Sequence, residues 1–435
     1  MRQYFWILVL LLSVQACKKD CQDIKPTPIP SCDSSRIPIV MVHGFLASGD
    51  TWAKQKMRFE SNGYCSQSVY VFDWNSLNQG ADNVQGLDAF INQILEETGK
   101  QQVNLVGHSA GGGIGYQYCA DAGRAAKIAH YVHVASSSQS GPAGPGGIVP
   151  TLNLWSTGDE VGQAGDIPGA VNRMLPDLDH YEVATSEASF TEMFRFFNPG
   201  QEPLTTGIPA EDVIRVSGKV LTLGENQPIN GATIEIYETD PNTGFRINSS
   251  PDLSISSDAE GNFEGFTAKK NVPYEFFVVT NKPGDRPIHY YRESFTRSNS
   301  LVYLRTLPPS GSTAGILLNS LPKNDQQSVA VVFTSSQAVV SGRDLLFVNN
   351  QELSTSQISP ASSTNIALFL YDSNNNGQTD LTQPVLFTFT PFLEAVDLYI
   401  PTQTQNTIDC RFNNRKLQMQ NWKSDSEGIT IAVFD

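Results

Sequence analysis

The fold of this chain is decided by the stretch Val103-Asn104-Leu105-Val106-Gly107-His108-Ser109-Ala110-Gly111-Gly112. An apolar run with the length of a buried strand ends in the spacing Gly-x-Ser-x-Gly, and residues that can start a helix follow. A tight turn needs little side-chain bulk, and Gly107 and Gly111 let the strand and the helix approach closely. The stretch predicts a strand, a sharp turn that presents Ser109, and a helix. The competing interpretation is an ordinary glycine-rich loop.

Strand and helix patterns alternate on both sides of this stretch, from residue 37 to about residue 197. Further strands are predicted at 37–42, 69–72, 128–135, 151–155 and 180–183. Helices are predicted at 52–60, with Ser48 or Asp50 as the cap, and at 82–98, 167–173 and 187–197. Such alternation predicts an α/β domain over 36–198, with a parallel sheet covered on both faces.

Helical periodicity disappears after Asn198-Pro199-Gly200, and short β-branched and aromatic strands take over. Residues 199–212 are interpreted as a linker. Strand patterns at 216–220, 229–237 and 257–263 make residues 213–307 resemble a transthyretin-like or carboxypeptidase-regulatory-like β-sandwich. Pro308-Pro309-Ser310-Gly311-Ser312 is a second linker, and 313–435 is a further all-β domain. Aromatic residues in these strands are interpreted as core packing rather than as a binding face.

The composition limits the partners. The chain has 435 residues, which favours two or three domains, and only 17% of them are charged. The formal net charge is −15, and the basic residues are scattered. A nucleic-acid partner is not expected, because no basic patch is available to displace counterions.

The N-terminus has the pattern of a targeting segment. Arg2 precedes a short apolar run, and small residues lead to Cys17. A cysteine at this place resembles the lipobox of bacterial lipoproteins, which implies that residues 1–16 are removed and that Cys17 carries a membrane anchor. Residues 17–35 then form a tether, and the protein is exported to the bacterial cell envelope. The alternative is plain secretion with Cys17 as an incidental thiol.

Five cysteines remain, an odd number, so at least one stays free in an exported protein. Cys32 and Cys65 each precede a predicted strand and form the most plausible pair, whereas Cys119 is expected to be a buried thiol. Asp372 to Asp380 has the front half of a calcium loop. Gln383 stands where the bidentate glutamate belongs, which favours a plain Asx-rich turn. No metal or other cofactor is predicted.

An acyl-transfer serine needs a base, a carboxylate to orient that base, and donors for the oxyanion. In folds with this elbow the chain order is serine, then acid, then histidine. Among the histidines after Ser109, His130 and His133 lie in a strand and His289 lies in the β-rich region, so His180 is the predicted base. Asp159 follows a strand end and is the predicted acid, with Glu160 and Asp166 as competitors. Asp177 and Asp179 are interpreted as solvated loop charges.

The predicted oxyanion donors are the backbone N–H groups of Ala110, which follows the nucleophile, and of Phe45, in the loop after the first strand. Gly44 permits this loop to turn its amides inward. His43 and His108 flank these positions and are interpreted as bracing residues.

A family resemblance covers about 160 residues. It rests on His43-Gly44-Phe45, Glu97-Thr98-Gly99, Val106 to Gly112, Ser156-Thr157-Gly158-Asp159 and the segment around His180. These segments resemble the small bacterial lipases of the class 2 type, which are minimal α/β-hydrolases. The added β domains resemble those of certain archaeal and bacterial lipases, where they are linked to long-chain substrates. The Gly/Pro-rich loop at 139–147 departs from the minimal lipases and leaves the acyl-chain preference open.

The resemblance implies a lipid-anchored serine carboxylic ester hydrolase of the triacylglycerol lipase kind. Its partners would be an ester substrate and the membrane, and the oligomeric state is left open. The alternatives are an esterase or polyesterase acting on other acyl substrates, and a surface binding protein with an inactive hydrolase core.

Overall fold

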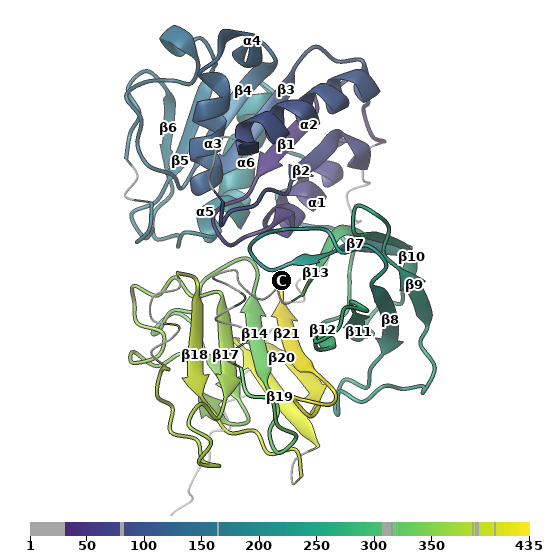
Figure 1. The fold of residues 1–435 in the computed structure, drawn as a ribbon. Helices are drawn as coiled ribbons and strands as arrows, with labels where there is room; N and C mark the ends of the chain where they lie inside the picture. The colour runs from purple at the N-terminus through teal and green to yellow at the C-terminus, as the bar shows by residue number, and fades with distance from the viewer. Residues whose placement is uncertain are drawn as a thin grey trace, which may run out of the picture.

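The computed structural model describes residues 31–78, 82–162, 165–306, 321–384, 391–403 and 406–435, together with positions 315, 319 and 387. The predicted leader 1–16, Cys17, Cys21 and the predicted linker 308–312 lie outside the described residues. Figure 1 shows one helix-containing unit above two strand-rich units, which lie side by side. We call these the first unit (residues 31–211), the second unit (212–306) and the third unit (321–435).

The first unit contains a six-stranded parallel sheet in the order β2-β1-β3-β4-β5-β6. Its strands are β1 (Ile39–Val42), β2 (Val69–Phe72), β3 (Val103–His108), β4 (Ile128–Val134), β5 (Thr151–Trp155) and β6 (Val171–Met174). Its helices are α1 (Ala53–Ser61), α2 (Asp82–Thr98), α3 (Ala110–Cys119), α4 (Ala122–Ala125), α5 (Glu182–Thr185) and α6 (Glu187–Phe197). Short 3-10 turns occupy Gly49–Trp52, Ser66–Ser68 and Pro145–Gly147.

Helices cover both faces of this sheet, because alternate strand side chains enter two separate apolar cores. Met41 packs with Phe59 of α1 and Phe190 of α6. Val40 packs on the opposite face with Ile91 of α2 and others from α3. The predicted α/β architecture with a parallel sheet is confirmed.

Two local predictions in this unit are wrong. Residues 171–174 form the edge strand β6 rather than a helix, since they pair in parallel with β5. Residues 180–183 do not form a strand. The Asp179 carboxylate instead accepts hydrogen bonds from the backbone N–H groups of Tyr181 and Glu182, both at 2.9 Å, and the chain turns into α5.

The cysteine predictions are tested at three positions. Cys32 and Cys65 form a disulfide across a sequence separation of 33 residues. Cys119 and Cys410 are free and buried, as expected for Cys119. Burial raises the pKa of the Cys119 thiol to about 12, so this thiol stays protonated and unreactive.

The second and third units are built from strands. The second contains β7 (Ile214–Thr222), β8 (Thr233–Glu238), β9 (Leu253–Ser256), β10 (Asn262–Ala268), β11 (Tyr274–Val279), β12 (Ile288–Arg292) and β13 (Asn299–Thr306). The third contains β14 (Ala330–Thr334), β15 (Leu346–Val348), β16 (Gln351–Glu352), β17 (Ala367–Tyr371), β18 (Leu393–Asp397), β19 (Thr407–Phe412), β20 (Arg415–Gln420) and β21 (Ile429–Phe434). The strand-rich architecture predicted after the first unit is confirmed for the described residues, among which positions 315 and 319 are helical rather than extended.

Strand pairing joins these two units into one body. β12 of the second unit pairs in parallel with β21 of the third, with Ile288 opposite Ile429 and Arg292 opposite Val433. The result is an eight-stranded sheet in the order β18-β17-β14-β21-β12-β11-β8-β9. The sheet therefore continues from one unit into the other, although residues 308–312 separate them in the sequence.

Buried polar contacts attach the first unit to this β body. The Asp50 carboxylate accepts a hydrogen bond from the Arg305 guanidinium at 2.5 Å; Asp50 is buried, and the Arg305 side chain is 11% exposed. Asp73 accepts hydrogen bonds from Lys219 at 2.9 Å and from the Tyr303 hydroxyl at 2.8 Å. A buried charge is tolerated only when it is paired, so these contacts specify how the two parts dock.

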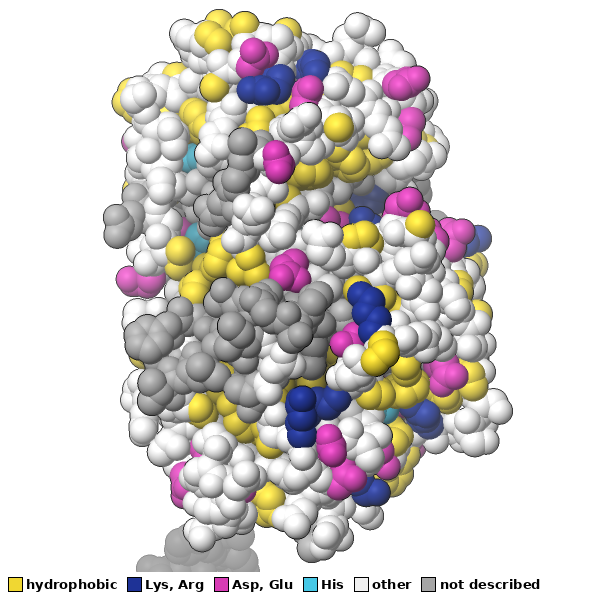
Figure 2. Space-filling model, viewed as in Figure 1, with side chains coloured by type: hydrophobic (Ala, Val, Ile, Leu, Met, Phe, Trp, Pro, Cys, Tyr) yellow, Lys and Arg dark blue, Asp and Glu magenta, His cyan; other side chains and the backbone are white. Residues whose placement is uncertain are grey.

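The surface and the remaining sequence motifs agree with a plain globular chain. Charged side chains of both signs are dispersed over the face shown in Figure 2. The Asp372 carboxylate accepts hydrogen bonds from the backbone N–H groups of Asn376 at 3.1 Å and Gly377 at 2.7 Å, as in an Asx-rich turn. Among the described residues no helix is long and apolar enough to cross a membrane.

Candidate active site

Ser109 lies between β3 and α3 in a conformation that non-glycine residues rarely adopt, with φ 54° and ψ −124°. The surrounding packing enforces it. A Cβ on Gly107 would lie 2.5 Å from the Gly111 carbonyl oxygen, and a Cβ on Gly111 would lie 2.4 Å from the His43 carbonyl oxygen. Such strain persists only where neighbouring structure over-determines it, and it occurs at functional sites. The predicted elbow geometry is therefore present at Ser109.

Asp159 and His180 form a buried pair. The Nδ1 atom of His180 lies 2.9 Å from Oδ1 and 3.0 Å from Oδ2 of Asp159. Oδ1 also accepts hydrogen bonds from the backbone N–H groups of Val161 at 2.9 Å and Gly162 at 3.0 Å. Burial acts to raise the pKa of Asp159, but the hydrogen bond and charge of His180 and these two amides outweigh it, and the pKa is lowered. Asp159 is thus held as a carboxylate against the imidazole.

The two competing acids do not reach His180. Asp166 instead accepts a hydrogen bond from the Trp155 indole at 3.0 Å, and Glu160 is exposed. The position of Asp159 is set by Ser156, a residue that sequence reasoning did not single out. The Ser156 hydroxyl oxygen accepts hydrogen bonds from Gly158 N–H and Leu178 N–H, both at 3.0 Å, and so joins the segment of Asp159 to that of His180.

His180 is almost fully buried, and its second ring nitrogen, Nε2, has no hydrogen-bond partner among the described residues. With Nδ1 occupied by Asp159, Nε2 is the free basic atom of the ring. The hydroxyl of Ser109 is not hydrogen-bonded to it. Such contacts are often long before substrate binds and shorten in the reacting complex.

His108 contacts both the backbone and the ring of His180, the predicted base. Its Nε2 lies 2.9 Å from the carbonyl oxygen of His180, and the two rings lie 4.7 Å apart. Burial, reinforced by the neighbouring His180, lowers the pKa of His108 to about 3. The neutral ring therefore donates its Nε2–H to the His180 backbone, which is the bracing role that the sequence suggested.

The segments that carry the two predicted oxyanion donors both lie beside Ser109. Ala110 begins α3, so its N–H is one of the first-turn donors that a helix leaves free. Phe45 follows Gly44, and a Cβ on Gly44 would lie 3.1 Å from the Cβ of Ser109, which places this loop against the serine. Within the described residues neither the Phe45 nor the Ala110 N–H donates a hydrogen bond.

The loop of Phe45 is held by His43 and by a residue that the sequence did not reveal. His43 Nε2 accepts a hydrogen bond from the Trp74 backbone N–H at 3.2 Å and lies 3.2 Å from the side-chain amide nitrogen of Asn226. Asn226 belongs to the second unit, has φ 55° and is buried. Burial lowers the pKa of His43 to about 4, so its ring is neutral and its Nε2 atom can accept a hydrogen bond. No local signal marks Asn226, because its role arises only when the second unit docks.

A cavity of about 330 Å³ opens beside Ser109. Its lining includes Ala110, a predicted oxyanion donor, and Gly162, whose N–H binds the Asp159 carboxylate. Gln139 lines it too, so the Gly/Pro-rich loop at 139–147 reaches the site. The Tyr116 hydroxyl anchors that loop by donating to the Gly141 carbonyl oxygen at 3.1 Å.

The remaining histidines take structural roles. His130 Nδ1 lies 2.8 Å from the Asn104 side-chain oxygen, and His133 contacts the Tyr131 hydroxyl at 3.0 Å and the Ser137 carbonyl oxygen at 3.0 Å. His289 pairs with the Glu275 carboxylate in the second unit at 2.6 Å. No described contact joins any of the three to Asp159 or Ser109, which agrees with their exclusion as residues of a strand or of the β-rich region.

One interpretation near the site is wrong. Asp179 is not a solvated loop charge: it is only 6% exposed, and its carboxylate binds the Arg343 guanidinium of the third unit at 2.9 Å. Asp177, by contrast, is an exposed residue with φ 59°. Sequence reasoning missed Arg343, since it lies 163 positions after His180 in the chain and no motif marks it.

Comparisons with known proteins agree with this architecture. The family model for the alpha/beta hydrolase fold matches residues 37–159, and the model for the lipase C-terminal domain matches residues 212–309. A third model, also for a C-terminal domain, matches residues 330–435. The second match names a lipase domain where the strand pattern resembled a transthyretin-like sandwich.

Solved structures that are similar to this chain cover a little over a third of it. A CIB-like hydrolase of Thermoplasma acidophilum is 19% identical, with 37% of this chain and 86% of that chain covered and a TM-score of 0.28. The mature lipase BlEst2 of Bacillus licheniformis is 16% identical, with 39% and 96% covered and a TM-score of 0.32. An esterase of a Rhodococcus species is 15% identical, with 39% and 93% covered and a TM-score of 0.30. The first unit thus has an α/β-hydrolase fold and the second unit is similar to a lipase C-terminal domain, a combination in which the chain resembles the lipase-like α/β-hydrolases.

Proposed function

We propose that this protein is a serine carboxylic ester hydrolase, most simply a triacylglycerol lipase, that acts through an acyl-enzyme. The observation that carries the proposal is the Asp159–His180 pair, with Nδ1 of the imidazole 2.9 Å from the carboxylate, on the same sheet edge as the strained Ser109. An inactive binding protein has no need to keep a buried, paired histidine and a strained serine together, so the non-enzymatic alternative is not favoured.

The proposed reaction has two halves, formation and hydrolysis of the acyl-enzyme, and His180 acts first as base and then as acid in each. His180 Nε2 takes the proton of the Ser109 hydroxyl as Oγ attacks the ester carbonyl carbon, and the N–H groups of Phe45 and Ala110 stabilise the oxyanion. His180 then gives the proton to the leaving alcohol as its bond to the acyl carbon breaks. Water then attacks the acyl carbon with His180 again as base. His180 returns this proton to Ser109 Oγ as the bond between Oγ and the acyl carbon breaks, and the carboxylic acid leaves. Asp159 stabilises the imidazolium in both halves.

The decisive test is hydrolysis of p-nitrophenyl butyrate by the wild type and by Ser109→Ala. Loss of the nucleophile should lower kcat by about 10⁴-fold or more. Ser137→Ala is the matched control, because Ser137 lines the same cavity but is exposed and has no proposed role. Equal turnover by wild type and Ser109→Ala would overturn the proposal.

The substrate class is proposed from the resemblance to the class 2 lipases and from the lipase C-terminal domain match. Emulsified long-chain triacylglycerols should be hydrolysed at rates comparable to short soluble esters. A strong preference for short-chain esters, or for polymeric esters, would favour the esterase or polyesterase alternative instead.

We also propose export to the bacterial cell envelope with a lipid on Cys17. The support is the sequence pattern around this residue. The wild type should partition with membranes, whereas Cys17→Ser should not carry lipid. Equal recovery of both forms in the soluble fraction, without lipid on either, would support plain secretion.

A further inference from the structure

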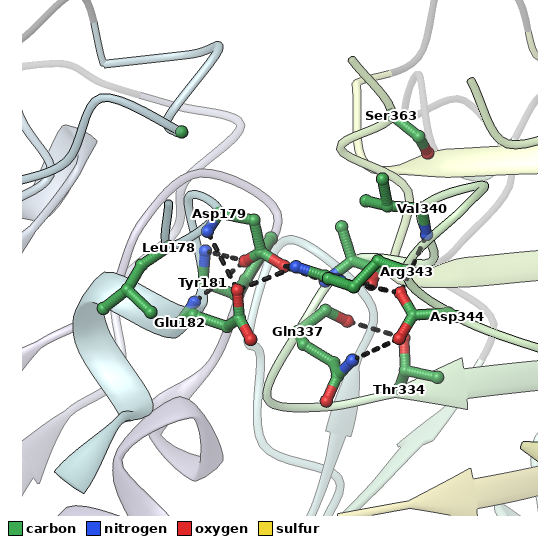
Figure 3. Close-up of polar contacts among 12 residues, drawn as sticks. Leu178, Asp179, Tyr181, Glu182, Thr334, Gln337, Val340, Arg343, Asp344 and Ser363 are labelled. Atoms are coloured by element: carbon green, nitrogen blue, oxygen red, sulfur yellow. Dashed lines mark hydrogen bonds and ion pairs between the residues drawn. The ribbon is translucent and has the colours of Figure 1, made fainter. Parts of the chain in front are cut away.

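The loop of the first unit that carries His180 contacts the third unit. Asp179, immediately before His180, and Tyr181, immediately after it, both make these contacts. Figure 3 shows Asp179 and Glu182 of the first unit facing Arg343 of the third. We propose that Arg343 is a positioning residue for the base, so that the third unit holds His180 in register with Asp159. This inference rests on the proposed function, in which His180 acts as the base.

Asp179 is the joint between the two units. Its Oδ1 accepts the N–H groups of Tyr181 and Glu182, both at 2.9 Å, which shapes the chain on the C-terminal side of His180. Its Oδ2 accepts the Ala338 N–H and an Arg343 Nη1–H, both at 2.9 Å. One buried carboxylate therefore grips the backbone next to His180 with one oxygen and the third unit with the other.

Arg343 is itself fixed in place. The Nη1 that binds Asp179 also donates to Glu182 at 2.8 Å, Nη2 donates to the Ala338 carbonyl oxygen at 2.5 Å, and Nε donates to Asp344 at 2.9 Å. Asp344 is buried and accepts the Val340 N–H at 3.0 Å and the Gln337 side-chain amide at 3.0 Å. A guanidinium with several engaged donors has one orientation, which a point-charge ammonium cannot reproduce.

A second contact from the same unit restrains the ring itself. The phenyl ring of Phe392 stacks on the His180 imidazole, with centroids 5.7 Å apart and planes 4° from parallel. Phe392 is buried and also packs edge-on against Tyr181 at 5.5 Å. The imidazole thus has Phe392 on one side and His108 nearby in the first unit, and its freedom to rotate away from Asp159 is small.

Removing Arg343 would leave two neighbouring carboxylates, Asp179 and Glu182, without their shared cation. The buried Asp179 would lose a charge-assisted bond, and mutual repulsion would push the two acidic side chains apart. The backbone N–H groups of Tyr181 and Glu182, just after His180, are bonded to Asp179 and would move with its carboxylate. The imidazole would therefore shift relative to Asp159. Small misplacements of a reacting group reduce rates strongly without altering substrate affinity equally.

The test compares Arg343→Gln with the wild type in the full chain, using p-nitrophenyl butyrate at a temperature where both are folded. The expected result is a kcat lowered by about 10- to 100-fold with KM changed less than about twofold. The matched control is Arg415→Gln. Arg415 also bridges two units, by pairing with Glu293, and its side chain is 31% exposed against 32% for Arg343. It does not contact the His180 loop, so the control should keep kcat.

A spectroscopic measurement separates positioning from general loosening. The Nδ1 proton of His180, bonded to Asp159, should give a far-downfield proton resonance in the wild type and in Arg415→Gln, and this signal should weaken or shift in Arg343→Gln. If Arg343→Gln does not fold, Arg343→Lys replaces it. The lysine keeps the charge and the stem but cannot engage Asp179, Asp344 and Ala338 together, so kcat should fall while the thermal midpoint changes little.

The outcomes distinguish this inference from the proposed function. If Ser109→Ala abolishes turnover while folded Arg343 variants keep kcat within about twofold and an unchanged downfield signal, the positioning role is wrong and the hydrolase proposal stands. A loss of kcat in Arg415→Gln equal to that in Arg343→Gln would also overturn it. If Ser109→Ala is as active as the wild type, the proposed function fails first.

Discussion

The side-chain amide of Asn226, in the second unit, lies 3.2 Å from Nε2 of His43, in the oxyanion loop of the first. The same amide donates to the carbonyl oxygens of Ala47 at 2.9 Å and Trp74 at 2.8 Å, and its oxygen accepts the Ser48 hydroxyl at 2.6 Å. Asn226 thereby links both strand-end loops that border the predicted oxyanion site. The second unit thus supports the donor side of the site, as Arg343 of the third supports the base side.

Replacing Asn226 with alanine should lower kcat for soluble esters by about tenfold, because unpaired buried acceptors would let the Phe45 loop relax. Asn281→Ala is the control, since Asn281 is another second-unit asparagine with positive φ, at 59°, but lies in an exposed turn. Steady-state kinetics of both variants measure the effect. Equal kcat in the two variants would show that Asn226 has no influence on the site.

Two glycines in α3 should respond oppositely to the same change. In Gly111→Ala the new Cβ would lie 2.4 Å from the His43 carbonyl oxygen, a backbone atom that cannot move aside without shifting the oxyanion loop. Gly113→Ala meets nothing within 4 Å and should stabilise the helix by up to about 1 kcal/mol. The midpoint of thermal unfolding should therefore be lower in Gly111→Ala than in the wild type, and higher or unchanged in Gly113→Ala. The reverse order would contradict the packing described for the elbow.

Acidification should destabilise the protein through its buried neutral histidines. Burial lowers the pKa of His133 to about 4, with His43 and His108 shifted in the same direction. Between an unfolded pKa of about 6.5 and the folded value, only the unfolded chain takes up the proton, so stability falls as pH drops through this window. His133→Gln removes one such group and should reduce the stability lost between pH 7 and pH 5 by about 2 kcal/mol. Urea unfolding at both pH values tests this, and an unchanged loss would refute it.

The disulfide between Cys32 and Cys65 should matter for stability and not for turnover. It closes a sequence separation of 33 residues, for which about 4 kcal/mol is expected. Cys65 lies before the amino end of β2, whereas Ser109 and Asp159 follow the carboxyl ends of β3 and β5. The double variant Cys32→Ser/Cys65→Ser should unfold at lower temperature yet keep kcat at 25 °C. Dithiothreitol should lower the thermal midpoint of the wild type alone, and an equal effect on both proteins would count against the bridge.

Local patterns predicted the core of the first unit because buried strands and amphipathic helices leave periodic signals. The strands at 69–72 and 151–155 and the helices at 82–98 and 187–197 follow directly from such patterns. Weak or short segments were misjudged. Residues 171–174 form a strand only because β5 offers its edge, and residues 180–183 turn into a helix only because Asp179 accepts their N–H groups.

Chain order, together with the predicted strands and the boundary of the β-rich region, is enough to select Ser109, Asp159 and His180 from the sequence. How these residues are supported becomes visible only in the folded chain. Asn226, Arg343 and Phe392 reach the site from units that follow it in the chain, and their contacts form when three separately encoded surfaces dock. A motif records neighbours along the chain, whereas docking brings together residues more than a hundred positions apart, which leave no periodic signal in the sequence.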